Sequence, residues 1–503
     1  MFPPKGKKPD DKVKVIHTGA ETRPLKRKNH DNKAIAGERN FAIAKNIKKY
    51  AVSLQNGFIA GRNFLCNVVG IDAFARFASY PCNFALLPLI VLFDLKAAFP
   101  SVAHQWLFKS LAAAGASVEL MNFVKALYIS VRVFVSVKSQ LKHAFFARSG
   151  VLTGCPLSAT LFVIAMDPFL KKFNRVLVEK SYGVLYACAD DLGGSLLRMT
   201  SLLVLHTIFD TMATVAGLIL NTSKCVIIPL VPSSSPLFCS YRVWLEKHIP
   251  DWASFKIATH AEYLGFEVGP EAGSYQWVKV LESFNANLTA TSNSGAPPSI
   301  SVFIYNAKLV PKFSYKAQLV PPVADIAELE KKWSCNILKA PFKSFPPALL
   351  YYGKSVGFYQ LSSVKVQSSA AAIRAAWSTV NNWKYWFDFL NYRSLTYPCL
   401  TLGALGNDFL SPPHWDSPPF AVNLAHANAG IVLGGTRDFS SAILPVKRGF
   451  YDPEVASTYK KTIQKHLAAV IKSIIYPNNI FYVLHLKAHK QKNTFCKRYR
   501  IYY

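Results

Sequence analysis

Two adjacent aspartates, Asp190 and Asp191, lie between apolar stretches in the segment YGVLYACADDLGGSLL, residues 182–197. The pattern of this segment predicts a strand, a tight turn and a second strand, with both acids at the turn. Like charges side by side repel each other unless solvent or a cation screens them. The pair therefore indicates either a solvated, Asp-rich hairpin turn, which is the commoner arrangement for such a dipeptide, or a cation-binding site.

A third acid, Asp94, ends an apolar strand predicted over residues 84–93. It precedes a helix predicted over residues 102–114, so one interpretation is that it caps that helix. An acid at the end of a buried strand also needs a polar or cationic partner. If this strand lies beside the hairpin of residues 182–197, three carboxylates converge. Such a set can hold two divalent cations, Mg²⁺ or Mn²⁺, for phosphoryl transfer.

The charge of the chain favours a polyanionic partner. Lys and Arg number 58 against 28 Asp and Glu, a net charge of +30 over 503 residues. Nucleic acid fits this imbalance, because each neutralised phosphate releases counterions. A generic basic protein such as a ribosomal one is the alternative, but such proteins are rarely this long or this aromatic. The nine cysteines form no CxxC pair, which argues against a zinc ribbon or a disulfide framework.

The cellular location is predicted from the same sequence. The first residues have no apolar core of a signal peptide. The longest apolar run, residues 84–93, is about half of what a bilayer requires and contains a proline. We therefore expect an intracellular protein of the nucleus or cytoplasm, without membrane contact.

Periodicity in the sequence predicts the remaining helices and strands. Helices are predicted over residues 33–50, 118–130, 157–175 and 201–216, a β-hairpin over 131–148 and a strand over 217–229. Residues 270–300 are rich in Gly, Ser, Asn and Pro and predict a boundary. Helical patterning follows over residues 302–380, whereas residues 381–503 predict no recognisable fold.

A series of short motifs runs through the first half of the chain in a fixed order. They are Arg23-Pro24-Leu25 with Asn29, Asp31, Asn32 and Lys33; Gln55-Asn56-Gly57-Phe58 with Gly61-Arg62; Phe93-Asp94-Leu95-Lys96-Ala97-Ala98-Phe99; Ser149-Gly150-Val151 with Gly154-Cys155-Pro156-Leu157-Ser158, Leu161-Phe162 and Asp167-Pro168; Ala189-Asp190-Asp191; Gly217-Leu218 with Leu220-Asn221 and Lys224; and Tyr263-Leu264-Gly265. In this order the segment from about Arg23 to Gly265 resembles the reverse transcriptases of non-LTR (LINE-type) retrotransposons, with weaker similarity to about residue 380.

The resemblance implies a fold and a function. The fold is the α+β right-hand polymerase, with a palm made of an antiparallel sheet backed by helices. Residues 1–20 would be a basic flexible arm, 21–270 the fingers and palm, 271–380 a thumb-like helical region and 381–503 an unassigned basic, aromatic region. The implied activity is RNA-directed DNA polymerase, which acts on an RNA template, a DNA primer and deoxynucleoside triphosphates.

The resemblance also implies roles for individual residues. Asp94, Asp190 and Asp191 would bind the two cations, and Lys224 would protonate the leaving pyrophosphate. The nucleotide site would comprise Arg23, Lys33, Arg62, Phe99, Gly150, Thr153 and Gly154, with Phe99 as a steric gate against ribose, and Tyr263, Leu264 and Gly265 would form the primer grip. Each has an ordinary alternative: surface charge for Arg23, Lys33 and Arg62, a core aromatic for Phe99 and a solvated lysine for Lys224.

Two departures from the family pattern keep other functions open. Thr153 stands where the family usually has Gln, and Cys188 stands where it usually has an aromatic residue before Ala-Asp-Asp. Both favour a catalytically impaired or domesticated nucleic-acid-binding protein. An RNA-directed RNA polymerase would more often show Gly-Asp-Asp and a small residue in place of Phe99, and a group II intron maturase would carry a splicing domain near its C-terminus.

Overall fold

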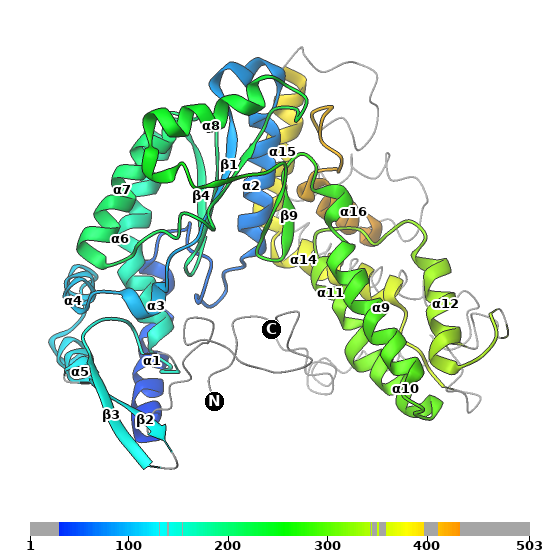
Figure 1. The fold of residues 1–503 in the computed structure, drawn as a ribbon, viewed down its shortest axis with the longest axis horizontal. Helices are drawn as coiled ribbons and strands as arrows, with labels where there is room; N and C mark the ends of the chain where they lie inside the picture. Colours follow the sequence, from blue (N-terminus) through cyan, green and yellow to red (C-terminus); the bar gives the residue numbers. More distant parts are fainter. Residues whose placement is uncertain are drawn as a thin grey trace. The chain divides into compact units, whose positions relative to one another are not determined.

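The computed structural model describes residues 30–129, 131–137, 140–152, 154–342, 344, 350–351, 359–396 and 411–432. The chain divides into two compact units, and each is considered by itself. Unit 1 comprises residues up to Gly273 together with two short later segments, one of which is Ser411–Ser417, and unit 2 holds most of the remaining described residues. Figure 1 shows the elements of both units in chain order.

Unit 1 combines a sheet with helices on its faces. Its helices are α1 (His30–Tyr50), α2 (Leu65–Ala78), α3 (Ala98–Ser101), α4 (His104–Ala113), α5 (Val118–Tyr128), α6 (Ser158–Glu179), α7 (Ser201–Ala216) and α8 (Leu237–His248), with 3₁₀ turns η3 (Pro81–Leu86) and η4 (Pro250–Trp252). Its strands are β1 (Leu89–Phe93), β2 (Val131–Val137), β3 (Gln140–Ala147), β4 (Gly183–Cys188), β5 (Asp191–Leu196), β6 (Val226–Pro229), β7 (Lys256–Ile257), β8 (Ala261–Tyr263) and β9 (Phe266–Val268).

The central sheet has the order β4-β5-β1-β6-β7. All five residues of β1 are buried, as the continuous apolar run of the sequence predicts for a strand covered on both faces. β1 pairs antiparallel with β5 and β6, but β6 and β7 run parallel, so one edge departs from the purely antiparallel sheet that was predicted. Helix α2 packs against β4 and β5, and α6 contacts β4 and α7.

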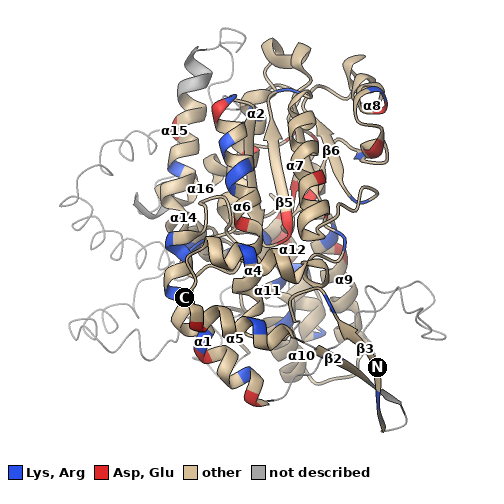
Figure 2. Cartoon of the chain, turned by 90° about the vertical axis from the view of Figure 1, so that its left-hand side faces the viewer, with Lys and Arg blue, Asp and Glu red and all other residues tan. Residues whose placement is uncertain are grey.

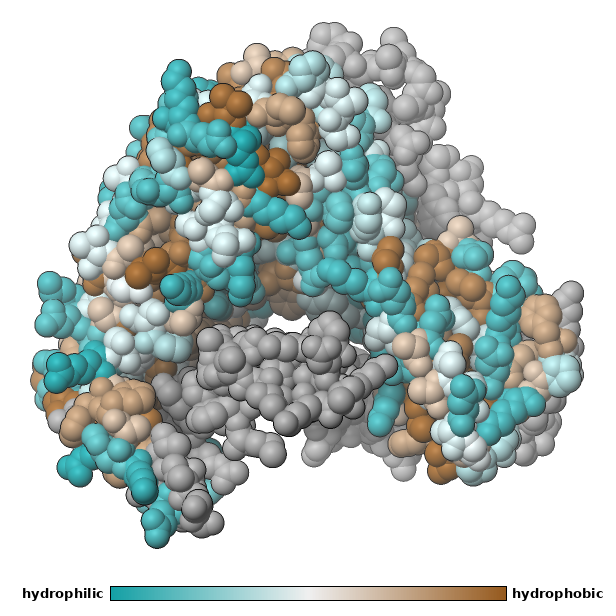
Figure 3. All heavy atoms as spheres, viewed as in Figure 1, coloured by the Kyte–Doolittle hydropathy of each residue, from teal (hydrophilic) through white to brown (hydrophobic). Residues whose placement is uncertain are grey.

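The core of unit 1 gathers aromatic rings around the end of β1. Phe93 contacts Phe209 of α7 at 4.6 Å between ring centroids and Trp252 at 5.7 Å. Because these rings fix the position of the residue before Asp94, they orient the end of β1. Figure 3 shows hydrophilic residues spread over the visible face of unit 1 among smaller hydrophobic areas, as expected once the large apolar side chains are inside.

Unit 2 is helical in its described part. It contains α9 (Val278–Asn293), α10 (Pro298–Ile304), the π-helical segment η6 (Tyr305–Leu309), α11 (Pro311–Lys316), α12 (Ile326–Leu338), α14 (Val364–Ser378), most of α15 (Val380–Thr396) and α16 (Phe420–Val432); the 3₁₀ turn η5 (Gly273–Tyr275) lies where the two units join. The helical patterning predicted over residues 302–380 is therefore confirmed for the described residues of that range. None of the described helices has both the length and the apolar character needed to cross a bilayer.

Two predicted strands are shorter in the structure, and one helix lies in a range that was predicted only as a boundary. The strand predicted over residues 84–93 begins only at Leu89, because the 3₁₀ turn η3 starts at Pro81 and reaches Leu86. The strand predicted over residues 217–229 is reduced to β6, since Gly217 ends α7 in the left-handed conformation. The boundary predicted over residues 270–300 agrees with the division of the two units after Gly273. The same range also contains the helix α9, in which Phe284 and Leu288 lie four residues apart on a buried face.

Candidate functional site

The register of the central sheet brings the three aspartates to one edge. Phe93 of β1 pairs with Leu192 of β5, so Asp94 follows β1 directly opposite Asp191. Cys188 pairs with Asp191 across the β4–β5 turn that carries Asp190. Partner Cα atoms in such ladders lie about 4.5–5.5 Å apart. The acidic segment at the start of β5 is visible in red in Figure 2.

The acids influence one another electrostatically. Burial, together with the charges of Asp190 and Asp94, raises the pKa of Asp191 to about 6. Burial also raises the pKa of Asp190, with a contribution from Asp94 in the same direction and an opposing backbone hydrogen bond. A cation bound between these groups would remove the repulsion, so the donors fit a divalent metal by charge and by their hard oxygen chemistry.

The side chains are not arranged as a closed metal site. Among the described residues, no group of three or more His, Cys, Asp or Glu lies in a position to hold a metal ion. The Asp94 side chain is 40% exposed.

Asp94 has two polar neighbours from the segment before β6. The Asn221 side-chain amide donates to Asp94 Oδ2 at 3.0 Å, and the Asn221 backbone N–H donates to the Asp94 carbonyl oxygen at 2.8 Å. Lys224 Nζ lies 4.0 Å from Asp94 Oδ2. The structure thus places Lys224 beside the acids. Asn221 belongs to one of the sequence motifs, but the sequence predicts no role for its side chain.

The turn between β4 and β5 is held from outside by Gln55. Ala189 has a φ of 59°, a left-handed conformation that an L-residue adopts at a cost. The Gln55 side chain is fully buried; its Oε1 accepts a hydrogen bond from the Ala189 N–H at 2.8 Å, and its Nε2 donates to the Ala189 carbonyl at 3.2 Å. Gln55 was identified from sequence only as part of a motif, because no local pattern links it to a residue 134 positions away.

Tyr263 lies beneath the acidic turn. Its ring packs so closely on Gly193 that a Cβ added there would lie 2.9 Å from a ring carbon. Its hydroxyl lies 3.5 Å from the Asp191 carbonyl oxygen, and burial raises its pKa. Leu264 and Gly265, with φ of 48° and 82°, form the two-residue turn between β8 and β9. The primer-grip role of these three residues stays a prediction.

Phe99 is half-buried and held by other rings. It stacks on Phe162 at 4.4 Å with an interplanar angle of 6°, and its edge contacts Phe58 at 6.0 Å. Gly150 has a φ of 88°, and a Cβ there would lie 2.4 Å from the Pro100 carbonyl oxygen, so glycine is required next to α3. Gly154 also has a positive φ, of 81°. Phe99 thus packs on the core, as the ordinary alternative expected, which leaves its role toward the sugar a prediction.

The predicted triphosphate ligands differ in their surroundings. The Arg62 guanidinium donates to the carbonyl oxygens of Lys48, Ala51, Val52 and Gln55, at 2.5–3.0 Å. In this structure Arg62 therefore supports the loop after α1, and binding of a triphosphate would compete with that function. Lys33 is exposed on α1. Arg23, Thr153 and the basic arm of residues 1–20 lie outside the described residues.

Cys188 faces the acids as a neutral group. Burial, together with the charges of Asp191 and Asp190, raises the pKa of its thiol to about 11. It is therefore protonated at neutral pH and adds no negative charge to the turn. The side chain is half-buried.

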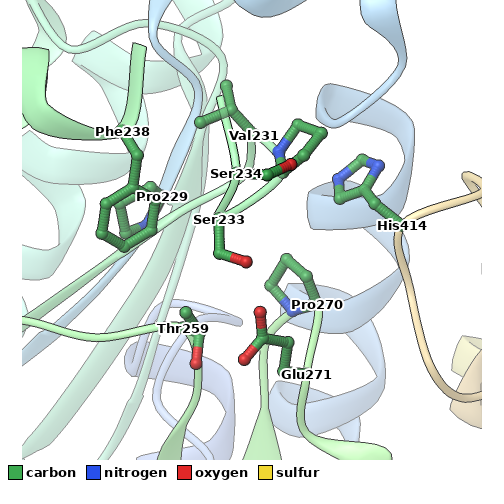
Figure 4. A pocket seen from close by; sticks show the side chains of 10 residues that line it. Pro229, Val231, Ser233, Ser234, Phe238, Thr259, Pro270, Glu271 and His414 are labelled. Atoms are coloured by element: carbon green, nitrogen blue, oxygen red, sulfur yellow. The ribbon is translucent and has the colours of Figure 1, made fainter. Parts of the chain in front are cut away.

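A separate pocket lies at the other end of the sheet. It has a volume of about 160 Å³ and is lined by residues that include Pro229, Phe238, Glu271 and His414 (Figure 4). Pro229 pairs with Leu89 at the start of β1, whereas Asp94 follows the end of that strand. The pocket is therefore distinct from the acidic edge.

One known family matches the part of the chain that carries the three aspartates. A family model described as reverse transcriptase (RNA-dependent DNA polymerase) matches residues 86–268, which include β1, the β4–β5 turn and the β8–β9 hairpin. Residues 86–268 are therefore similar to a reverse transcriptase domain. Two curated proteins from transposable elements are also similar to part of this chain.

The first relative is the transposon TX1 uncharacterized 149 kDa protein of Xenopus laevis, 29% identical over 176 residues, which are 34% of this chain and 13% of the relative. The second is the Pol polyprotein of the type-1 retrotransposable element R2 of Bradysia coprophila, 30% identical over 154 residues, which are 29% of this chain and 17% of the relative. The chain thus spans less than a fifth of either relative. Among solved structures, apo telomerase of Candida tropicalis matches 88% of this chain and 60% of its own at 12% identity with a TM-score of 0.35, too low to establish a common fold.

Proposed function

We propose that this chain is an RNA-directed DNA polymerase that extends a primer by two-metal phosphoryl transfer at Asp94, Asp190 and Asp191. The observation that carries the proposal is the β1–β5 register, which sets Asp94 opposite Asp191 inside a reverse transcriptase domain. Divalent metals are the general cofactors of this family. Two ions, Mg²⁺ or Mn²⁺, are our proposal for this site.

Each residue near the acids can contribute by its position. The bound cations would supply charge neutralisation and a lowered pKa for the primer 3′-hydroxyl. Asn221 holds Asp94 through its side-chain amide, and Lys224, 4.0 Å from Asp94, can donate a proton toward leaving pyrophosphate. Phe99, fixed by Phe162, would present a ring edge to the sugar.

The proposed partners are an RNA template, a DNA primer and deoxynucleoside triphosphates. The net charge of +30 supports binding of a polyanion. We also propose that unit 1 provides the fingers and palm and that unit 2 provides the thumb of a right-hand polymerase. An intracellular location, in the nucleus or cytoplasm, goes with these substrates.

The test is primer extension on RNA and DNA templates with Mg²⁺ or Mn²⁺, using the full chain and its Asp190→Asn variant. Extension by the wild type and its loss in the variant, with template binding unchanged, would support the proposal. Extension that persists in Asp190→Asn would contradict it, because the activity would then not depend on the acidic turn.

A second candidate is a nucleic-acid-binding protein that has lost catalysis. The observation that favours it is Cys188, a small side chain directly opposite Asp191 where related enzymes carry an aromatic ring. The same experiment separates the two candidates. Tight binding of template–primer without extension in either metal would select the second, and replacing Cys188 with Tyr should then be tested for recovery of activity.

A further inference from the structure

The loop between α1 and α2 runs along the edge of β4 next to the acidic turn. The Asn56 N–H donates to the Ala187 carbonyl oxygen at 2.8 Å, and the Ala187 N–H donates to the Leu54 carbonyl oxygen at 2.9 Å. Gln55 and Ala187 therefore form a short parallel bridge at the outer edge of the sheet. This segment of the loop, residues 54–57, is called the Gln55 segment below.

The Gln55 side chain continues this pairing around the turn. Its Oε1 accepts from the Ala189 N–H at 2.8 Å and from the Gly57 N–H at 2.9 Å, and its Nε2 donates to the Ala189 carbonyl oxygen at 3.2 Å. One buried amide thus satisfies both backbone groups of the residue before Asp190. The backbone groups of Ala189 therefore need no water, because the completely buried Gln55 side chain bonds to both of them.

Close approach of the two segments depends on Gly57. A Cβ added at Gly57 would lie 2.3 Å from the Ala189 nitrogen, so another residue would push the loop from the turn. Helix α2 adds a further tie, since Asn67 Nδ2 donates to the Ala187 carbonyl oxygen at 3.0 Å and Asn67 Oδ1 accepts from Asn56 Nδ2 at 2.6 Å.

The loop itself is anchored away from the turn. Arg62 donates to three of its backbone carbonyl oxygens, including that of Gln55, and to that of Lys48 in α1. Asp167 Oδ1 accepts from the Val52 N–H at 2.7 Å. Because the loop is fixed by these hydrogen bonds, it can restrain the conformation of the β4–β5 turn. The contacts run from α1 and α6 through Gln55 to Ala189.

We propose that Gln55 is a positioning residue for Asp190 and Asp191, which keeps Ala189 left-handed so that both carboxylates face the cation site. This inference rests on the proposed function of the acids as metal ligands. It assigns Gln55 no contact with substrate. Its effect is transmitted through the backbone of Ala189.

The test uses the full chain with Gln55→Met, which keeps the length of the side chain but removes all three hydrogen bonds. Tyr241→Phe is the matched control, because it removes one buried side-chain bond to the Pro88 carbonyl oxygen, before β1 and away from Asp94. Hydrogen exchange of the peptide spanning residues 187–191 should accelerate about 10-fold in Gln55→Met, the factor expected for about one lost hydrogen bond. It should be unchanged in Tyr241→Phe.

Affinity for Mn²⁺, measured by electron paramagnetic resonance without nucleic acid, should fall about 10–100-fold in Gln55→Met, as for other outer partners of metal ligands. In primer extension kcat should fall while KM for template–primer stays constant. The metal measurement separates this inference from the proposed function. If the wild type binds Mn²⁺ but does not extend a primer, the proposed polymerase activity is wrong, whereas the role of Gln55 can still be measured by Mn²⁺ affinity.

Three results would overturn the inference: unchanged Mn²⁺ affinity in Gln55→Met, an equal loss in Tyr241→Phe, or a wild type that binds no Mn²⁺. Gln55→Asn, which retains a shorter amide, provides the same measurements if the Met variant does not fold. If neither variant folds, Gln55 has a global structural role and the inference is wrong.

A different observation concerns the two-stranded ribbon β2–β3. Its register pairs Arg132 with Phe146 and Phe134 with His143, and paired residues share a face of the ribbon. The rings form a continuous row, with His143 at 5.7 Å from Phe134 and 4.9 Å from Phe146. Phe134 and Phe146 are each 49% exposed. We call these four residues the aromatic face of the ribbon.

The ribbon is also basic. Residues 131–148 contain no Asp or Glu, and Arg132, Lys142 and Arg148 are exposed. Figure 1 shows β2 and β3 close to α5. Exposed rings beside cationic groups match the chemistry of unpaired nucleic acid, whose bases stack on rings while its phosphates pair with the charges.

From this we infer that the aromatic face binds single-stranded nucleic acid. The inference deepens the proposed function, because it names a surface for an unpaired strand outside the acidic edge. The ribbon offers its own control: Phe145 is 55% exposed but pairs with Val133, so it points from the opposite face.

The test measures binding of labelled oligo(U) and of a double-stranded RNA of equal length by fluorescence anisotropy. The double variant Phe134→Ala/Phe146→Ala should weaken binding of oligo(U) about 5–100-fold, through loss of base stacking, and leave duplex binding unchanged. Phe145→Ala should leave both unchanged. If the wild type has no polymerase activity but still shows this binding pattern, the proposed function is wrong and the binding role of this surface is supported.

Two outcomes would overturn the assignment of this face. Equal weakening by Phe145→Ala, or no weakening by the double variant, would show that the rings do not stack on bases. Self-association of the wild type in sedimentation that disappears in the double variant would show that the face binds a second copy of the chain instead.

Discussion

Replacement of Asp191 with asparagine should stabilise the metal-free protein at neutral pH. The pKa of Asp191 is raised from 3.8 to about 6, first by burial and then by Asp190 and Asp94. Asparagine keeps the shape of the side chain but carries no charge. The repulsion within the acidic turn is therefore removed, although catalysis should be lost with the ligand.

The magnitude follows from the shift in pKa. About two pKa units correspond to about 3 kcal/mol at ~1.4 kcal/mol per unit. Although the protein around Asp191 raises its pKa, the side chain keeps more than a third of its surface accessible to solvent, so screening reduces the expected gain to about 1 kcal/mol. In a unit of this size such a gain raises Tm by about 2–4 °C.

The sign depends on pH. Between 3.8 and about 6 the folded protein holds a proton on Asp191 that the unfolded chain has released, so stability falls as pH rises through this window. Asp191→Asn should consequently match the wild type below pH 3.8 and exceed it above about 6. Excess Mg²⁺ should reverse the order at neutral pH, because it stabilises only the protein that binds it.

Differential scanning calorimetry in chelator, at a series of pH values, measures this difference. Asp251→Asn, at an 84%-exposed aspartate of unit 1, is the control and should show no gain. A variant that is less stable than the wild type at neutral pH in chelator would refute the reasoning, since the carboxylate would then be stabilising without a metal.

Four further outcomes are expected. Asp94→Asn should abolish primer extension while template–primer affinity, measured by filter binding, changes little. Phe99→Val should admit ribonucleotides about 10–200-fold better in single-nucleotide incorporation, and unchanged rejection would leave Phe99 as a core residue stacked on Phe162. Binding of template–primer should weaken with salt at a slope of about −0.9 per neutralised duplex phosphate, and a flat response would contradict an electrostatic groove. Lys224→Met should lower kcat more than KM and flatten the alkaline limb of the pH–rate profile, an effect that Lys224→Arg should partly restore.

Much of unit 1 could be predicted from periodicity and motif order. The hairpin around Asp190, the buried strand before Asp94, the ribbon of residues 131–148 and the helices α1, α5, α6 and α7 all lie where local patterns predict them. Local patterns did not predict the helix α9. Residues 270–300 were predicted only as a boundary, which agrees with the division of the units after Gly273, yet Phe284 and Leu288 bury one face of a helix there.

The sequence alone determined the residue types of the proposed site: three aspartates beside the ends of apolar strands, in an order that resembles reverse transcriptases. That information is local, because strand ends and turns are encoded by neighbouring residues. Only the tertiary structure decided three contacts: the pairing of β1 with β5, the hydrogen bonds of Gln55 to Ala189, and the hydrogen bonds of Arg62 to backbone carbonyl oxygens. The physical reason is that these contacts join residues that are far apart in the sequence; Gln55 and Ala189, for example, are 134 positions apart. Their partners are often backbone groups, which every residue carries, so the sequence does not mark them.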